Sequence, residues 1–258
     1  MTLGIYLNGD SQTIGSDLPW SQQSDDVFVG SYADHLVHHL GGEIIANPAV
    51  GGGSNDRIMR TTNQMLDDCE RNTWARNPYP DFIVIGWTEW SRYDWFYNGK
   101  YRSMHAAQDG LSIEETALEK NHPRAEWQKW ILSDARLTGT AHVAFYYNQM
   151  MNLHSRLEYL KIPHLFLNAH AGFYDEYGVE HRRNHMAVDL FEGFDWQNCF
   201  WNVFAREDAS FTSWAGSRGY KDVPGWHYEH QAHIDFGKVM YDYIQEHDLL
   251  NMYNSETV

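Results

Sequence analysis

Cysteine, positive charge and long apolar runs are all scarce in this sequence of 258 residues. The two cysteines, Cys69 and Cys199, do not form a Cys-x-x-Cys pair, so we expect neither a disulfide framework nor a metal site of that type. Lys and Arg number 19 against 35 Asp and Glu, which gives a net charge of −16. A chain this acidic is unsuited to binding nucleic-acid phosphates or anionic membrane surfaces.

Segments that would direct the chain to a membrane are also missing from the sequence. No stretch of 18 apolar residues is present, so no transmembrane helix is expected. A basic segment followed by an apolar run, the pattern of a signal peptide, is not seen at the N-terminus. With two unpaired cysteines, these absences predict a cytoplasmic protein. The composition, 43% hydrophobic and 21% charged, is typical of a globular chain, and we expect one domain over 1–258.

Short apolar segments alternate with helical ones along the chain. Strands are predicted at 2–8, 43–46, 81–86 and 162–168, and helices at 27–41, 54–76, 125–161 (broken near Thr138-Gly139) and 228–246. Residues 91–124 and 170–225 are expected to be long irregular insertions. This alternation predicts an α/β fold in which helices cover both faces of a mostly parallel sheet, a three-layer α/β/α sandwich. In such sheets ligands bind at the carboxyl ends of the strands.

Three turns follow predicted strands and are therefore expected at that edge of the sheet. They are Gly9-Asp10-Ser11, Gly51-Gly52-Gly53 and Gly86-Trp87-Thr88. Asp10 is expected to stabilise the first turn by hydrogen bonds. A serine alcohol is a weak nucleophile that needs an adjacent base and donors for the developing oxyanion, so Ser11 is the candidate around which a site would be built.

In block order these motifs resemble the SGNH/GDSL hydrolases, a superfamily of esterases, lipases, thioesterases and carbohydrate deacetylases. Residues 9–11 match its Gly-Asp-Ser block, and 47–52 match its second block, a loop that begins with Asn and carries an oxyanion Gly. The His-x5-His of its last block is matched at 227–233. The resemblance covers the chain from end to end and implies a flavodoxin-like α/β/α fold.

The resemblance also implies the roles of single residues. Ser11 would be the nucleophile and His227 its base. The backbone N–H groups of Ser11 and Gly52 would be the oxyanion donors. Such an enzyme needs no metal ion and no organic cofactor, and its partner would be a small-molecule or carbohydrate ester.

Two positions depart from the family pattern. The third block reads Gly86-Trp87-Thr88-Glu89 where the family has Gly-x-Asn-Asp, so Thr88 would replace the oxyanion Asn, and Trp87 is a candidate for contacting substrate. The usual position of the triad acid, three residues before His227, is Pro224. Asp222 is the nearest acid that a bent loop could bring to the base.

The leading hypothesis is therefore hydrolysis of an ester by a Ser-His dyad or triad, with an O-acetyl group on a carbohydrate as one candidate substrate. The alternative is an SGNH-like binding or structural module, and the two departures favour it. Residues 8–15 and 85–90 are also similar to uncharacterised SGNH-like proteins of marine bacteriophages, so that module could be part of a virion. A metal site at His227, His230 and His233 is a further alternative, although helical zinc sites usually have an i, i+4 pair.

Overall fold

The computed structural model describes residues 2–16, 18, 30–73, 79–89, 92–97, 100–105, 135–170, 193–203, 205, 207–223 and 227–253. Its centre is a parallel sheet in the order β2-β1-β3-β6. The strands are β1 (Gly4–Asn8), β2 (Glu43–Ala46), β3 (Phe82–Trp87) and β6 (His164–Asn168). They agree closely with the four predicted strands.

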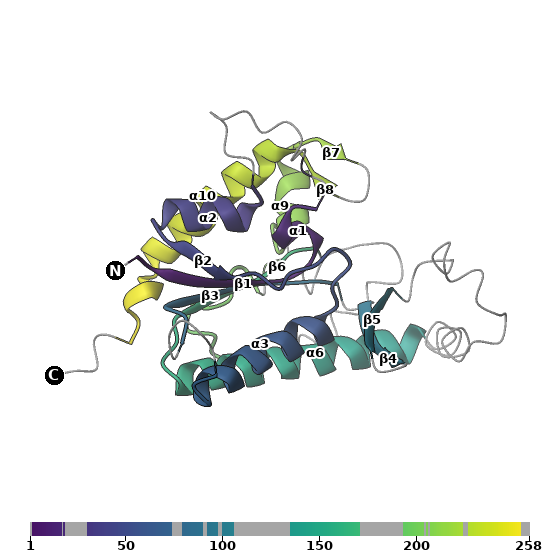
Figure 1. The fold of residues 1–258 in the computed structure, drawn as a ribbon. Helices are drawn as coiled ribbons and strands as arrows, with labels where there is room; N and C mark the ends of the chain where they lie inside the picture. The colour runs from purple at the N-terminus through teal and green to yellow at the C-terminus, as the bar shows by residue number, and fades with distance from the viewer. Residues whose placement is uncertain are drawn as a thin grey trace.

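Helices cover both faces of this sheet (Figure 1). On one face lie α1 (Ser11–Ile14), α2 (Tyr32–His39), α9 (Phe211–Ser217) and α10 (His230–Glu246). On the other lie α3 (Asn55–Glu70) and α6 (Ala135–Tyr159). The predicted three-layer α/β/α arrangement is confirmed. None of the helices in the described ranges is long and apolar enough to cross a membrane.

The layers follow from the alternation of side chains along each strand. The face toward α2, α9 and α10 carries Ile5, Leu7, Phe82, Val84, Leu165 and Leu167. The face toward α3 and α6 carries Tyr6, Ile83, Ile85, Trp87 and Phe166. Because both faces are covered, the strands are apolar at nearly every position, which is why the sequence shows them as continuous apolar runs.

Local signals explain where the main helices begin. Ser31 caps α2 in a capping box with Asp34, and Ser54 caps α3 by accepting a hydrogen bond from the Arg57 amide. In α10 the buried apolar side chains are Ala232, Phe236, Met240 and Ile244, each four residues from the next. Of the four positions that the sequence predicts for the core face of this helix, Ile244 is buried, whereas Ile234, Val239 and Tyr243 are only partly buried.

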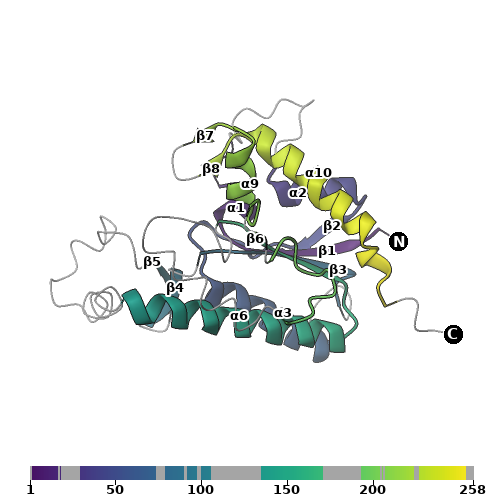
Figure 2. The same cartoon turned by 180° about the vertical axis from the view of Figure 1, so that it is seen from behind.

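Several features differ from the sequence prediction. Helix α9 lies within 170–225, which was predicted to be irregular. The long helix α6 continues through Gly139, where a break was predicted. A hairpin, β4 (Arg92–Tyr97) and β5 (Lys100–His105), lies within a stretch predicted to be irregular. The 3-10 helix η2 (Leu249–Asn251) follows α10. Just before α10, the short strand β7 (Asp222–Val223) pairs with β8 (His227–Tyr228). Figure 2 shows the hairpin at the carboxyl end of the sheet, beside α6.

The strand order also fixes where a site can form. The chain leaves β1 toward β2 on one side and later returns to β3 on the other side, so β1 and β3 flank a point at which the direction of winding reverses. Ligands of doubly wound sheets bind at such a point, outside the carboxyl ends of the strands. Asp10 and Ser11 follow β1 there, and Thr88 follows β3.

Candidate active site at the carboxyl edge of the sheet

Ser11 lies in the first turn of α1, directly after β1, and is buried. The short helix starts here because the Asp10 side chain caps it and Gly15 ends it in a left-handed conformation, with φ of 70°. Gly9 is required by close packing: a Cβ at this position would overlap the Thr13 side chain and lie 2.9 Å from the Gly86 carbonyl oxygen. The predicted nucleophile is therefore held at the edge where the strands end.

Asp10 is the centre of a hydrogen-bond network that joins three strand ends. Its Oδ1 accepts from the Gln12 amide at 3.0 Å. Its Oδ2 accepts from the Thr88 hydroxyl at 2.6 Å and from Arg92 Nη1 at 3.1 Å. His170 Nε2 lies 2.9 Å from the same oxygen. The expected turn-stabilising bond is present, and three further contacts come from segments that follow β3 and β6.

The charge of Asp10 is stabilised by these neighbours although the side chain is fully buried. Burial alone would raise the pKa of a carboxyl group. The contacts with His170, Arg92 and Thr88 outweigh burial and hold the pKa of Asp10 well below its usual range. Arg92 is itself shared, because its Nε donates to Glu89 at 3.0 Å. The site therefore contains a permanent, buried carboxylate next to Ser11.

Thr88 does not have the role predicted for it. A hydroxyl has one proton to donate, and that of Thr88 goes to Asp10. The Thr88 backbone is fixed as well, because its N–H and carbonyl both pair with the Asn55 side chain at 3.0 Å. The hydroxyl is thus directed into the network and away from a substrate oxygen.

Trp87 also differs from its predicted role as a substrate contact. Its side chain is fully buried, in the core between the sheet and the layer of α3 and α6. The ring packs edge-on against Phe166, with centroids 5.3 Å apart. Alternation along β3 explains this, since Trp87 faces the same side as Ile83 and Ile85.

The predicted oxyanion loop lies next to the nucleophile segment. The Gly53 amide donates to the Val50 carbonyl at 3.0 Å, and Gly52 has φ of +69°, which together form a tight turn that requires glycine at Gly52. A Cβ on Gly53 would lie 3.1 Å from the Gly9 carbonyl oxygen. The Gly53 N–H is therefore occupied by the hydrogen bond of the turn. Gly52, whose N–H is the predicted oxyanion donor, is exposed.

His227, the predicted base, is a buried residue of β8. Its ring lies 6.3 Å from that of His170, at an angle of 69°. Because His170 contacts Asp10, the neighbour of Ser11, the structure brings both imidazoles to the same edge of the sheet. No hydrogen bond joins Ser11 and His227 among the described residues, a common situation in substrate-free sites, where catalytic hydrogen bonds are often long.

His170 was missed by sequence reasoning, as was Arg92. His170 lies two positions after the end of β6. Its backbone carbonyl accepts a hydrogen bond from the Ser210 hydroxyl, which also caps α9. The available signal was position: a polar side chain just past the end of a buried strand, as for Ser11 and Thr88.

The structure does not bring Asp222 to His227. In the antiparallel pair β7–β8, Asp222 is opposite Tyr228, and Val223 is opposite His227. Directly opposite residues share a face, and successive residues alternate. The Asp222 side chain is therefore exposed on the face away from the imidazole. Pro224 lies outside the described residues.

The alternative metal site at the start of α10 is not formed either. His230 Nε2 lies 3.1 Å from His35 Nε2 of α2, and His233 Nδ1 accepts from the Tyr32 amide at 3.1 Å. Burial lowers the pKa of His233 to about 3, so this ring is a neutral acceptor that joins α10 to α2. The rings of His230 and His233 thus both contact α2, whereas the ring of His227 packs against His170. The three imidazoles therefore do not converge on one point.

Comparison with known proteins gives a family but no activity. Residues 23–184, well over half of the chain, match the sequence model of a family described as "Family of unknown function (DUF6071)". Among curated proteins, none matches this sequence. The resemblance to bacteriophage proteins is not addressed by these matches and stays a prediction.

One similar solved structure is the psychrotrophic esterase EstA from Pseudoalteromonas sp., in a crystal structure described as inhibited by monoethylphosphonate. It shares 11% identity with this chain, and the match covers 94% of this chain and 97% of that one with a TM-score of 0.45. A likeness at this level says nothing about the activity of this chain, which has to be argued from its own residues.

Proposed function

The chain belongs to the DUF6071 family, whose function is unknown, and we propose from its own site that it is a serine hydrolase acting on esters. The observation that carries the proposal is the setting of Ser11. Its hydroxyl lies in a first helical turn beside the ionised Asp10, at an edge where His170 and His227 meet. Nucleophilic acyl transfer by a serine needs an imidazole base near the hydroxyl, and the presence of two imidazoles at the edge where Ser11 lies supports this role.

In the proposed reaction the Ser11 Oγ attacks the ester carbonyl while His227 takes the hydroxyl proton. The tetrahedral oxyanion is bound by the backbone N–H groups of Ser11 and Gly52. His227 then gives its proton to the leaving alcohol, and an acyl-enzyme remains on Ser11. Water activated by His227 hydrolyses that intermediate and restores the serine.

His170 has a positioning role in this scheme. Its Nε2 is held by Asp10, and its ring packs edge-on to that of His227. We therefore assign the stabilisation of the base to the pair of Asp10 and His170, since the exposed Asp222 faces away. His227→Gln should lower kcat by about 10²–10⁴-fold, the usual contribution of a general base. His170→Gln should have a smaller effect and shift the pH profile.

The proposed substrate is a neutral ester, with an O-acetylated carbohydrate as the leading candidate. A net charge of −16 repels anionic substrates. The chain also contains 11 Trp and 16 Tyr, residues suited to stacking on sugar rings.

The test is labelling with a fluorophosphonate probe, which reacts with activated serines, together with turnover of p-nitrophenyl acetate. We expect the wild type to be labelled and active and Ser11→Ala to be neither. Ser16→Ala is the matched control, because Ser16 is an exposed serine of the same segment, and it should behave as the wild type.

A second candidate is a binding or structural module without activity. Two observations favour it: the Thr88 hydroxyl is used by Asp10, and Asp222 does not reach His227. Folded wild-type protein that is neither labelled nor active would refute the hydrolase and leave this module.

A further inference from the structure

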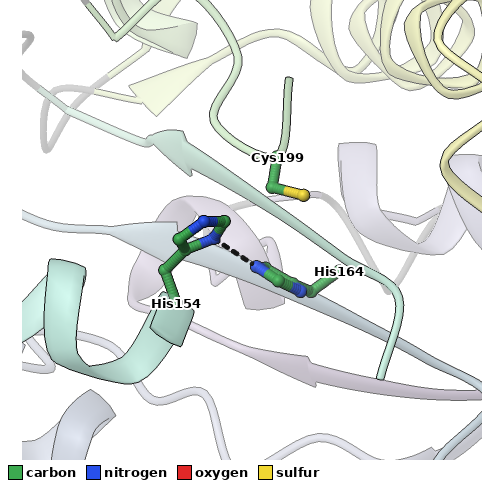
Figure 3. A group of neighbouring side chains, drawn as sticks. All are labelled: His154, His164 and Cys199. Atoms are coloured by element: carbon green, nitrogen blue, oxygen red, sulfur yellow. Dashed lines mark hydrogen bonds between the residues drawn. The ribbon is translucent and has the colours of Figure 1, made fainter. Parts of the chain in front are cut away.

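A second cluster of reactive side chains lies at the other end of β6, away from Ser11. It consists of His154 from α6, His164 at the start of β6, and Cys199 from the segment beside β6 (Figure 3). All three are buried. One ligand atom from each can be chosen so that the three lie within 4.8 Å of one another. Nothing in the proposed hydrolase uses these residues.

The contacts of the two imidazoles need more protons than two neutral rings can supply. His164 Nδ1 lies 2.9 Å from the Ile162 carbonyl, which can only accept, so this nitrogen carries the proton and Nε2 is a lone pair. That lone pair must accept from His154 Nδ1, which lies 2.8 Å away. His154 Nε2 is then a lone pair too, although it lies 3.3 Å from the Glu158 carboxylate, another acceptor.

Two neutral rings carry two protons, whereas the pair has three contacts that each need one: to the Ile162 carbonyl, to the Glu158 carboxylate and between the two rings. The two inner nitrogens, which face each other in Figure 3, are a place where a cation other than H⁺ is favoured.

We propose that this cluster binds a divalent metal ion of the zinc type through His154 Nδ1, His164 Nε2 and Cys199 Sγ. The ion replaces the proton shared by the two rings. The His154 proton moves to Nε2 and is donated to Glu158. Each metal-bound imidazole then has an outer acceptor, a carboxylate for His154 and a carbonyl for His164, as is usual for metal-ligating histidines.

The donor set decides which ion fits. Two imidazoles and a thiolate suit Zn²⁺ or Co²⁺, whereas Mg²⁺ and Ca²⁺ require oxygen ligands. With Zn–N near 2.0–2.1 Å, the two nitrogens of a tetrahedral site are roughly 3.3 Å apart, so the rings have to separate by about half an ångström. Metal binding would break only two long contacts of the cysteine sulfur, at 3.7 Å to the Gln197 carbonyl and at 3.8 Å to the Met252 sulfur.

Binding must release a proton from the cysteine. Cys199 is fully buried, and burial favours the uncharged thiol over the thiolate in the free protein. The step is therefore Cys–SH plus M²⁺ giving Cys–S–M⁺ plus H⁺, with one proton passing to solvent. The metal would connect α6, β6 and the segment at 193–200, which gives it a structural role.

The experiment uses full-length protein freed of metal with a chelator. Co²⁺ is titrated as a spectroscopic stand-in for Zn²⁺, and Zn²⁺ is titrated in buffers of different ionisation enthalpy to count protons. We expect one ion per chain, one proton released for each Zn²⁺, and a thiolate-to-cobalt charge-transfer band. Cys199→Ala should lose the band, and Cys69→Ala should keep it. Cys69 is the matched control because it is also buried, with a pKa that burial raises to about 11.

Three results would overturn the site. They are the absence of stoichiometric binding, a cobalt spectrum without the charge-transfer band, and a band that survives in Cys199→Ala. If Cys199→Ala fails to fold, the spectrum and the proton count of the wild type decide, since surface histidines bind Co²⁺ without a thiolate. The site is independent of the proposed hydrolase, so its failure leaves the labelling of Ser11 unaffected.

Discussion

Asp10→Asn tests whether the buried carboxylate holds the carboxyl edge of the sheet together. The substitution keeps the size of the side chain and removes its charge, while Arg92 stays mostly buried beside it. Removing one partner of a buried ion pair costs about 3–5 kcal/mol, and we expect a cost near the lower end because Arg92 keeps its contact with Glu89. In a chain of this length 1 kcal/mol lowers Tm by roughly 2–4 °C, so we expect Tm to fall by about 10 °C.

Thermal and urea unfolding, followed by circular dichroism, would measure this effect. The control is Asp208→Asn, which breaks an exposed pair with Arg218 and should cost about 1 kcal/mol or less. The pKa of Asp10 is lowered by folding, so its contribution is complete above the unfolded pKa near 4 and is lost as the pH falls further. An Asp10→Asn protein as stable at pH 7 as the Asp208→Asn control would refute the reasoning.

Two further predictions concern packing and acid stability. Gly86→Ala should destabilise the protein by about 1–3 kcal/mol, because the new Cβ would overlap the Thr13 hydroxyl, whereas Gly193→Ala meets no atom within 4 Å and should be nearly neutral in urea unfolding. Burial lowers the pKa of His233 to about 3, so below the unfolded value near 6.5 the unfolded chain binds the proton first. Stability should therefore be highest above pH 6.5 and fall toward pH 3, by up to about 1.4 kcal/mol per pH unit for this ring; urea midpoints equal at pH 7 and pH 5 would contradict this.

The sheet could be predicted because each central strand is buried on both faces and reads as an apolar run. Helices were harder to define from one sequence. The phase of α10 depends on which face meets α2, where Gly237 allows close approach: a Cβ there would lie 2.9 Å from the Tyr32 carbonyl oxygen. No local pattern encodes that contact. Gly139 suggested a break in α6, but a single glycine costs a helix only about 1 kcal/mol, which the packing of a long helix outweighs.

Local motifs located the parts of the site that are contiguous in sequence. They placed Ser11 and the loop around Gly52 at the same edge, since both follow strands. The partners of Asp10 could not be found in this way, because Arg92 begins a hairpin and His170 follows β6, each about 80 or more residues away. The Thr88 hydroxyl illustrates the limit: the residue type allows an oxyanion role, and only the position of Asp10 shows where the hydroxyl points.

The charges around Ser11 also restrict how the proposed reaction could be catalysed. Arg92 is the cation nearest the nucleophile segment among the contacts of Asp10, but its guanidinium is shared between Asp10 and Glu89. A cation already paired with two carboxylates adds little to the stabilisation of a third negative charge. The oxyanion must therefore depend on backbone amides, which carry no counter-charge and need no reorganisation.

Replacing Gly52 with Ala would strain its positive φ and disturb one of these amides, so we expect kcat to fall by about 10²–10³-fold while fluorophosphonate labelling of Ser11 persists at a lower rate. Unchanged p-nitrophenyl acetate turnover in folded Gly52→Ala would remove this loop from the mechanism.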